Sequence, residues 1–128
     1  MKKIRIAKVG QVKANKYGNR KTTIDGYKFD SAAEAKHYTQ LKMLLRAGKI
    51  QNLVLQPGFV LQEAFTLNGK RYQEIKYISD FKYIELDGTV VITDVKGKIT
   101  PEYALKKKMF LKIYGVEVKF IELMIKDI

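Results

Sequence analysis

The segment VVITDVKG, Val90 to Gly97, restricts the possible folds more than any other part of the sequence. It begins as a run of β-branched apolar residues, which is typical of a strand that is buried in a sheet. It ends with Asp94 and Lys96 two positions apart, and in a strand side chains at this spacing point to the same face. The sequence therefore predicts a central strand that leaves the core beside a polar site.

Two helices are predicted from their end signals. The first runs from Ser31, an N-terminal cap, to Ala47, and Gly48 supplies a left-handed stop. The second lies between Thr100, which can cap it, and Gly115. The apolar residues expected to face the core from this second helix are Ala104, Leu105, Met109 and Ile113.

The remaining segments are predicted as strands. Asn68-Gly69 is the strongest hairpin signal, with strand character in residues 53–56 and 59–65 before it and 71–86 after it. Residues 116–125 alternate, and this last strand must join the sheet beside residues 90–95 if the second helix is a crossover. The order α-β-β-β-α-β predicts an α/β (α+β) fold with a mixed central β-sheet flanked by helices.

The composition indicates a single globular domain with a basic start. The chain has 128 residues, no cysteine and a formal net charge of +12. These features exclude disulfides and thiolate metal sites and favour a polyanionic partner such as nucleic acid. We expect residues 1–21 to form a basic, flexible arm before one domain of residues 22–128. No stretch approaches the roughly 18 apolar residues of a membrane span, so we expect a cytoplasmic protein without a membrane partner.

The loop around Asp87 decides whether a second acid meets Asp94. If Leu86, Asp87 and Gly88 form a three-residue loop with Gly88 in the left-handed conformation, Asp80 falls opposite Asp94 on the same face. If the loop has only two residues, Asp80 points to the other face. The alternative for an isolated Asp-x-Lys is a strand end that enters solvent.

Glu34 is a third candidate acid. It shares a helical stripe with Tyr38, Leu41 and Leu45, which places it on the side that should pack against the sheet. The alternative is a capping box, in which Glu34 only reaches back to Ser31 at the start of the helix.

Three carboxylates in one partly buried place raise one another's pKa unless they hold a cation. Mg²⁺ suits such a site, because it accepts one or two carboxylates, keeps several waters and takes further oxygen ligands from a phosphate. Lys96 would then hold or polarise the attacking water and offset charge that develops on the phosphoryl group.

These residues, in this order, resemble the PD-(D/E)XK nuclease superfamily. The resemblance rests on Glu34 in a helix, Asp80 in a strand and Asp94-Val95-Lys96 fourteen positions later. The superfamily core is a helix, a three-stranded meander, a helix and a further strand, the restriction-endonuclease-like fold. Ser79 stands where the motif name has proline, which bears on the entry to the strand rather than on the chemistry.

Longer segments resemble a small phage and prophage family of uncharacterised-domain proteins assigned to this superfamily. These segments are KYGNRKTTIDGYKFDSAAEAKHY, LQPGF, YISDF and TDVKG. The family is similar to Holliday junction resolvases and other phage recombination endonucleases. This similarity implies a homodimer, because two symmetric cuts need two sites.

The resemblance also implies a role for each candidate residue. Asp80, Asp94, Glu34 and the carbonyl of Val95 would be metal ligands, and Lys96 would be the catalytic lysine. The implied cofactor is Mg²⁺, with Mn²⁺ as a substitute, and no small-molecule cofactor is expected. The candidate DNA contacts are Lys13, Lys16, Arg20 and Lys21 in the arm and Lys106, Lys107 and Lys108 in the second helix, although solvated basic segments would have the same composition.

The sequence thus predicts a Mg²⁺-dependent DNA endonuclease that hydrolyses phosphodiester bonds. Branched or Holliday-junction DNA is the expected substrate, in phage recombination or DNA processing in the host cytoplasm. The alternatives are a nuclease for duplex or single-stranded DNA, a basic nucleic-acid-binding protein without catalysis, and a silent nuclease fold that serves as a phage regulator.

Overall fold

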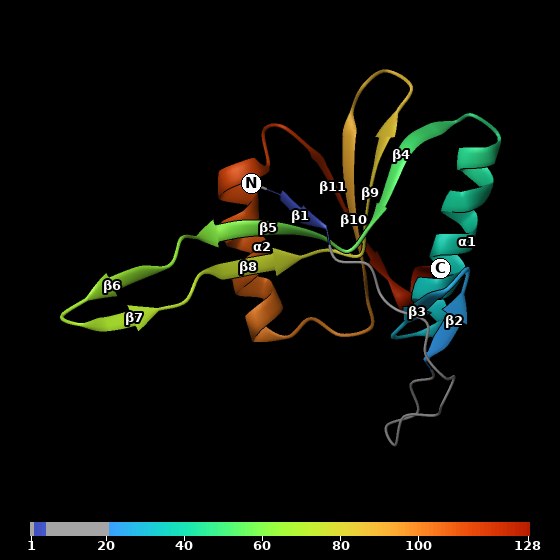
Figure 1. Cartoon of the computed structure of the whole chain (residues 1–128). Coiled ribbons are helices and arrows are strands. Elements are labelled where there is room, and N and C mark those ends of the chain that lie inside the picture. Colours follow the sequence, from blue (N-terminus) through green and yellow to red (C-terminus); the bar gives the residue numbers. More distant parts are fainter. Residues whose placement is uncertain (1, 5–20) are drawn as a thin grey trace.

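The computed structural model describes residues 2–4 and 21–128 of the chain (Figure 1). The elements in this part are β1 (Lys2–Ile4), β2 (Thr22–Ile24), β3 (Tyr27–Phe29), α1 (Ala32–Arg46), β4 (Ile50–Leu55), β5 (Pro57–Gln62), β6 (Phe65–Leu67), β7 (Lys70–Tyr72), β8 (Ile75–Ile78), β9 (Phe81–Glu85), β10 (Val90–Lys96), α2 (Pro101–Tyr114), β11 (Lys119–Met124) and the 3-10 helix η1 (Ile125–Asp127). The mixed α+β class predicted from the sequence is confirmed.

A four-stranded sheet with the order β11-β10-β9-β4 forms the centre of the fold. Strand β10 pairs antiparallel with β9 and parallel with β11, so α2 is the crossover that the sequence predicts. Helix α1 lies beside one face of this sheet and α2 lies toward the opposite side (Figure 1). The sheet therefore has a hydrophobic core on each face. Val91 of β10 packs in the cluster that includes residues of α1, and Ile92 packs in the cluster that includes residues of α2.

One long, bent hairpin builds much of the rest. Its two arms pair near the central sheet as β4 with β9 and farther out as β5 with β8. Between these pairs the arms change sheet at Gln56, which has a φ of 51°, and at Ser79-Asp80. The outer half forms a second sheet with the order β1-β5-β8, and its tip, β6–β7, projects from the body (Figure 1). The single meander suggested by the sequence is therefore divided between two sheets.

Strand β1 falls in the range that the sequence assigns to the basic arm. It pairs antiparallel with β5, with Lys2 opposite Phe59 and Ile4 opposite Pro57. Residues 5–20 of that range lie outside the described residues.

The loop between β9 and β10 has the three-residue form. Glu85 and Thr89 close it, because the N–H of Glu85 donates to the carbonyl of Thr89 at 2.9 Å. The N–H of Gly88 donates back to the carbonyl of Glu85 at 2.9 Å, and Gly88 has a φ of 91°, a conformation that glycine adopts without strain. The resulting register pairs Val90 with Ile84 and continues in steps of one along both strands.

Helix α2 begins and ends where the sequence predicts, but it presents a different face. Thr100 caps it through the N–H of Tyr103 and Gly115 lies at its end. Three of the residues expected in the core are exposed: Ala104, Leu105 with 59% of its surface and Ile113 with 48%. The buried residues are Tyr103 and Phe110, two helical turns apart. Aromatic rings of β5 and β8 pack against this pair, so the aromatic spacing and not the aliphatic spacing sets the inner face.

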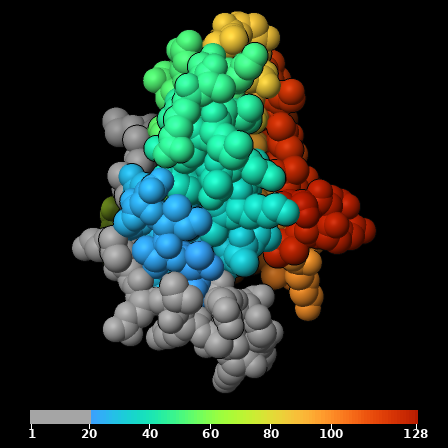
Figure 2. Space-filling model, turned by 90° about the vertical axis from the view of Figure 1, so that its right-hand side faces the viewer, coloured from blue at the N-terminus to red at the C-terminus, as the bar shows by residue number. Residues whose placement is uncertain are grey.

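Helix α1 covers the molecule on the side shown in Figure 2, with the β2–β3 hairpin at its lower end and the C-terminal residues beside it. Its inner face carries Tyr38 and Leu41, both 2% exposed, and the stripe predicted from the sequence is confirmed. No helix in the described part of the chain is long and apolar enough to cross a membrane.

Candidate functional site

Asp94 lies near the end of β10 and is almost completely buried, with 1% of its surface exposed. Its Oδ2 accepts a hydrogen bond from the hydroxyl of Tyr77 on β8. The ammonium of Lys96 lies 3.3 Å from Oδ1, close enough for attraction between charges. Its geometry is nevertheless not that of a hydrogen bond, and Oδ1 has no hydrogen-bond partner among the described residues. Asp94 is therefore hydrogen-bonded through Oδ2, whereas its Oδ1 is buried beside Lys96 without a hydrogen bond.

Asp80 lies at the corner where the bent hairpin changes sheet. Its backbone N–H donates to the carbonyl of Thr93 at 3.2 Å, and its carbonyl accepts from the N–H of Gln56 at 2.8 Å. These bonds continue the β9–β10 register by one step, which places Asp80 opposite Asp94 as the three-residue loop requires. Its side chain is also fixed, because Oδ2 accepts a hydrogen bond from the N–H of Val95 at 2.7 Å.

The surroundings of Asp80 oppose its ionisation. Burial raises its pKa well above the ordinary value of 3.8, and the negative charges of Glu34 and Asp94 raise it further. The hydrogen bond from the N–H of Val95 acts in the other direction, because it stabilises the carboxylate.

Glu34 reaches the same region from the first turn of α1. The N–H of Glu34 donates to Oγ of Ser31 at 3.1 Å, so Ser31 caps the helix. The side chain of Glu34 points inward, and the residue is only 7% exposed. Burial is the main cause that raises the pKa of Glu34 from 4.5 to about 7, followed by the charges of Asp30 and Asp94, while Lys96 opposes the shift.

A pocket of about 500 Å³ connects these groups. We call it the carboxylate pocket, and it is lined by Asp30, Ser31, Glu34, Asp80, Val95, Lys96, Gly97, Lys98 and Ile125. Four elements or their ends meet there, namely α1, the β8–β9 corner, β10 and η1. The structure thus brings Glu34, Asp80, Val95 and Lys96 to one cavity, whereas Asp94 is buried and is not part of its lining.

Lys96 is held between a charge and a ring. Its ammonium lies 3.3 Å from Oδ1 of Asp94 and 4.2 Å from the centre of the Tyr103 ring, an arrangement that stabilises a cation. The hydroxyl of Tyr103 donates to Oε1 of Glu122 at 2.7 Å, and the ammonium of Lys107 lies 2.9 Å from the same oxygen. Tyr103 is therefore fixed from behind, and Lys96 keeps a defined place.

The basic residues predicted to contact DNA occupy different environments. Lys106 is half-buried and lies 3.2 Å from Glu102, Lys107 is engaged with Glu122, and Lys108 is exposed. Of the arm, Lys21 lies just before β2 and is partly exposed. Lys13, Lys16 and Arg20 lie outside the described residues.

One protein-family model covers the whole site. The sequence model of the family described as "Protein of unknown function (DUF1064)" matches residues 14–126. The chain belongs to the DUF1064 family. Searches of curated proteins and of solved structures gave no match.

The donors of this DUF1064 site fit a hard cation such as Mg²⁺. Carboxylate oxygens and a backbone carbonyl are the ligand types that Mg²⁺ takes. The buried Oδ1 of Asp94 has no hydrogen-bond partner in the described part of the chain. Burial, and after it the charges of neighbouring acids, raises the pKa values of Glu34 and Asp80, so a cation would favour the ionised forms of both. Among the described residues, no group of three or more His, Cys, Asp or Glu side chains is already arranged to hold a metal ion.

Sequence reasoning did not identify Tyr77, Tyr103 or Glu122 as part of the site of this DUF1064 protein. Tyr77 reaches Asp94 only because the hairpin changes sheet, and no local pattern signals that change. Tyr103 could have been found from its spacing of seven from Phe110, the other buried residue of α2.

Proposed function

We propose that this protein is a Mg²⁺-dependent DNA endonuclease that hydrolyses phosphodiester bonds. The observation that carries the proposal is the meeting of Asp80 and Asp94 at the end of β10, with Glu34 above them and Lys96 on the same strand. Acidic ligands for a cation and a lysine beside them are the groups that metal-assisted hydrolysis of a phosphodiester needs.

The arrangement of the elements also supports a PD-(D/E)XK-like core. In chain order, α1, β4, β9, β10, α2 and β11 follow the predicted sequence α-β-β-β-α-β. The three antiparallel strands are neighbours, and β11 adds to β10 in parallel. The outer part of the bent hairpin, β5 to β8, is then an insertion between the first and second strands of that core.

The residues of the site divide the proposed reaction among them. Glu34, Asp80, Asp94 and the carbonyl of Val95 would hold Mg²⁺, which when bound supplies a Lewis acid for phosphoryl oxygens and lowers the pKa of a water. The hydroxyl of Tyr77 fixes the carboxylate of Asp94, and the N–H of Val95 fixes that of Asp80.

Lys96 orients the attacking water and offsets the negative charge that develops on the phosphoryl oxygens. Burial and the charge of Asp94 raise the pKa of Tyr77 well above 10, so its hydroxyl remains a donor throughout.

A substrate panel tests the proposal. Purified full-length protein is incubated with four-way junction, fork, flap, duplex and single-stranded DNA under Mg²⁺ or Mn²⁺, and cleavage is followed on denaturing gels. We expect cleavage of at least the junction, and we expect Asp94→Asn or Lys96→Met to abolish it while DNA binding persists. Lys112→Ala, an exposed lysine on α2, is the matched control. Preference for junctions and the homodimer remain predictions of the resemblance.

A second candidate function is DNA binding without cleavage, which the net charge of +12 favours. In that case the wild type binds DNA but cuts no member of the panel with either ion, and the endonuclease proposal is lost.

A further inference from the structure

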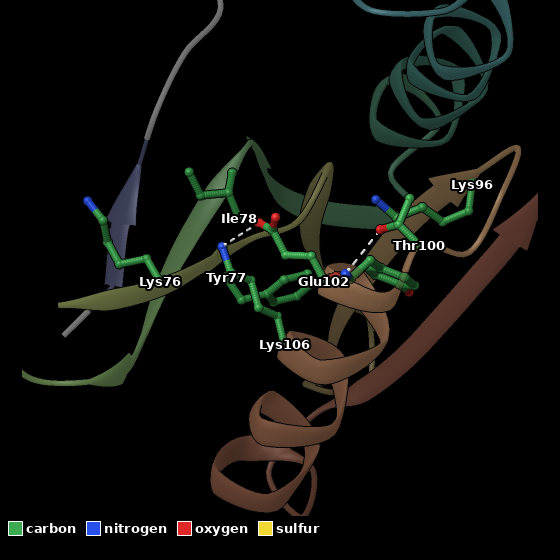
Figure 3. A pocket seen from close by; sticks show the side chains of 8 residues that line it. Lys76, Tyr77, Ile78, Lys96, Thr100, Glu102 and Lys106 are labelled. Carbon is green, nitrogen blue, oxygen red and sulfur yellow. Dashed lines mark hydrogen bonds and ion pairs between the residues drawn. The ribbon is translucent and has the colours of Figure 1, made fainter. Parts of the chain in front are cut away.

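A second cavity of about 360 Å³ adjoins the carboxylate pocket (Figure 3). We call it the lysine pocket, and its walls include Lys76, Lys96, Lys106, Thr100, Glu102 and Tyr103. Figure 3 shows Lys76 and Lys106 on one side of it and Lys96 with Thr100 on the other. Three lysines, from β8, β10 and α2, therefore line one hollow of the surface.

The carboxylates near these lysines leave them able to take another anion. Lys76 lies 3.3 Å from Glu74, and Lys106 lies 3.2 Å from Glu102. The side chain of Glu102 is 78% exposed, so it can turn to solvent at little cost. Because an ammonium has three donors, one such contact also leaves donors for a phosphate.

Lys96 belongs to the walls of both pockets. A nucleic-acid strand with one phosphate at the carboxylate pocket would therefore bring a neighbouring phosphate toward Lys76 and Lys106. The three consecutive lysines of α2 therefore have different surroundings. Lys106 faces the lysine pocket, Lys107 is tied to Glu122, and Lys108 is exposed outside the pocket.

We propose that the lysine pocket binds the backbone phosphate of DNA next to the phosphate that is cleaved, with Lys76 and Lys106 as its contacts. The identity of the ligand rests on the proposed endonuclease function, whereas the pocket and its three cations do not. The site would give affinity and register to the strand without reading its sequence, as phosphate contacts do.

Equilibrium binding in EDTA tests the pocket without any cleavage. The double variant Lys76→Ala/Lys106→Ala is compared with Lys49→Ala/Lys112→Ala, which removes the same charge at exposed positions outside both pockets. Fluorescence anisotropy with a labelled single strand is measured over a salt series for each full-length protein, after circular dichroism has shown that both fold.

We expect the pocket variant to bind about three- to tenfold more weakly at low salt. The slope of log K against log salt should decrease by about 0.7, the value for one phosphate contact on a single strand. The control should change by less than half as much. Equal losses in both variants would show a simple effect of net charge and would overturn the proposal.

The reverse change provides a gain-of-affinity test. Glu102→Gln removes the negative charge from the pocket wall and should tighten binding about twofold or more, whereas Glu117→Gln, at an exposed position elsewhere, should not. Equal effects of the two substitutions would contradict the proposal.

A final experiment distinguishes failure of this inference from failure of the endonuclease proposal. If the wild type cleaves DNA, an uncharged methylphosphonate beside the cleaved bond should weaken wild-type binding but not binding by Lys76→Ala/Lys106→Ala. Equal weakening in both proteins would overturn the phosphate site. If the wild type cleaves nothing, the endonuclease proposal fails, and the binding comparison still decides whether the lysine pocket holds a phosphate.

Discussion

Replacing Glu34 by Gln should stabilise the metal-free protein at alkaline pH. Glu34 is only 7% exposed, and its pKa is raised from 4.5 to about 7 in the folded chain. Between these two values the folded state holds more protons than the unfolded state, so the free energy of unfolding falls as the pH rises. In Glu34→Gln the side chain cannot ionise, so this fall in the free energy of unfolding is absent.

The structure sets the size of the effect. A shift from 4.5 to about 7 corresponds to about 3 kcal/mol at a pH above both values. A carboxylate in the first turn of a helix gains roughly 0.3–1 kcal/mol from the helix dipole, and Glu34→Gln loses that gain. The variant should therefore be more stable than wild type by about 2 kcal/mol at pH 8, and the two should be nearly equal at pH 4.

Urea denaturation in EDTA across this pH range measures the difference directly. Glu117→Gln, the loss of an exposed carboxylate, is the control for general changes of charge. With Mg²⁺ at pH 8, wild type should gain more stability than Glu34→Gln, because the cation offsets the repulsion that the variant lacks. If wild type and Glu34→Gln show the same dependence of stability on pH, the carboxylates do not interact as argued.

Four further substitutions test the surroundings of the site and the elements that position it. Tyr77→Phe should cost about 1–3 kcal/mol in chemical denaturation, because it leaves a second oxygen of buried Asp94 unpaired, and it should weaken Mg²⁺ binding in calorimetry about tenfold. Gly88→Ala should destabilise by about 1–2 kcal/mol through its φ of 91° alone, since an added Cβ has open space around it, and urea denaturation would reveal a smaller cost if the loop relaxed. Phe65→Ser, at a position 42% exposed on the projecting hairpin, should change the free energy of unfolding by less than about 0.5 kcal/mol, whereas Phe81→Ala in the core should cost about 3–5 kcal/mol.

The sequence left the loop at two or three residues, and this local choice alone decides the register of the acids. Gly88 is the residue that accepts a left-handed conformation at the end of a three-residue loop, and both neighbouring strands alternate regularly. Once the loop length is set, pairing carries Asp80 to Asp94 without any tertiary information. Helix ends were predictable for the same reason, since Ser31 and Thr100 cap through hydrogen bonds to residues three positions away.

The change of sheet at Asp80 was not predictable, because the hydrophobic alternation continues through it. Tyr77, Ser79, Phe81 and Tyr83 are all buried at every second position, as in one unbroken strand. Yet Tyr77 packs in the core beside α2, whereas Phe81 and Tyr83 pack in the core beside α1. The hairpin bends where its buried face passes from the core beside α2 to the core beside α1. The positions of these two helices are not encoded in the sequence of the strand itself.

The electrostatics of the site support the proposed cation. Glu34, Asp80 and Asp94 are brought together beside Lys96, and Asp30 and Lys98 also line the pocket, so full ionisation would leave an excess of negative charge in a largely buried place. Glu34 alone then costs about 3 kcal/mol, a large share of the roughly 5–15 kcal/mol that stabilise an ordinary domain.

Helix capping does not need an ionisable side chain at position 34. Oγ of Ser31 already accepts a hydrogen bond from the N–H of Glu34, and a Gln at this position would keep that bond. A DNA-binding module gains still less, since buried carboxylates repel phosphates. In the proposed endonuclease a divalent ion would remove this repulsion, and Lys96 would lie beside it, so the unfavourable electrostatics are the physical reason for proposing an endonuclease and not a binding module.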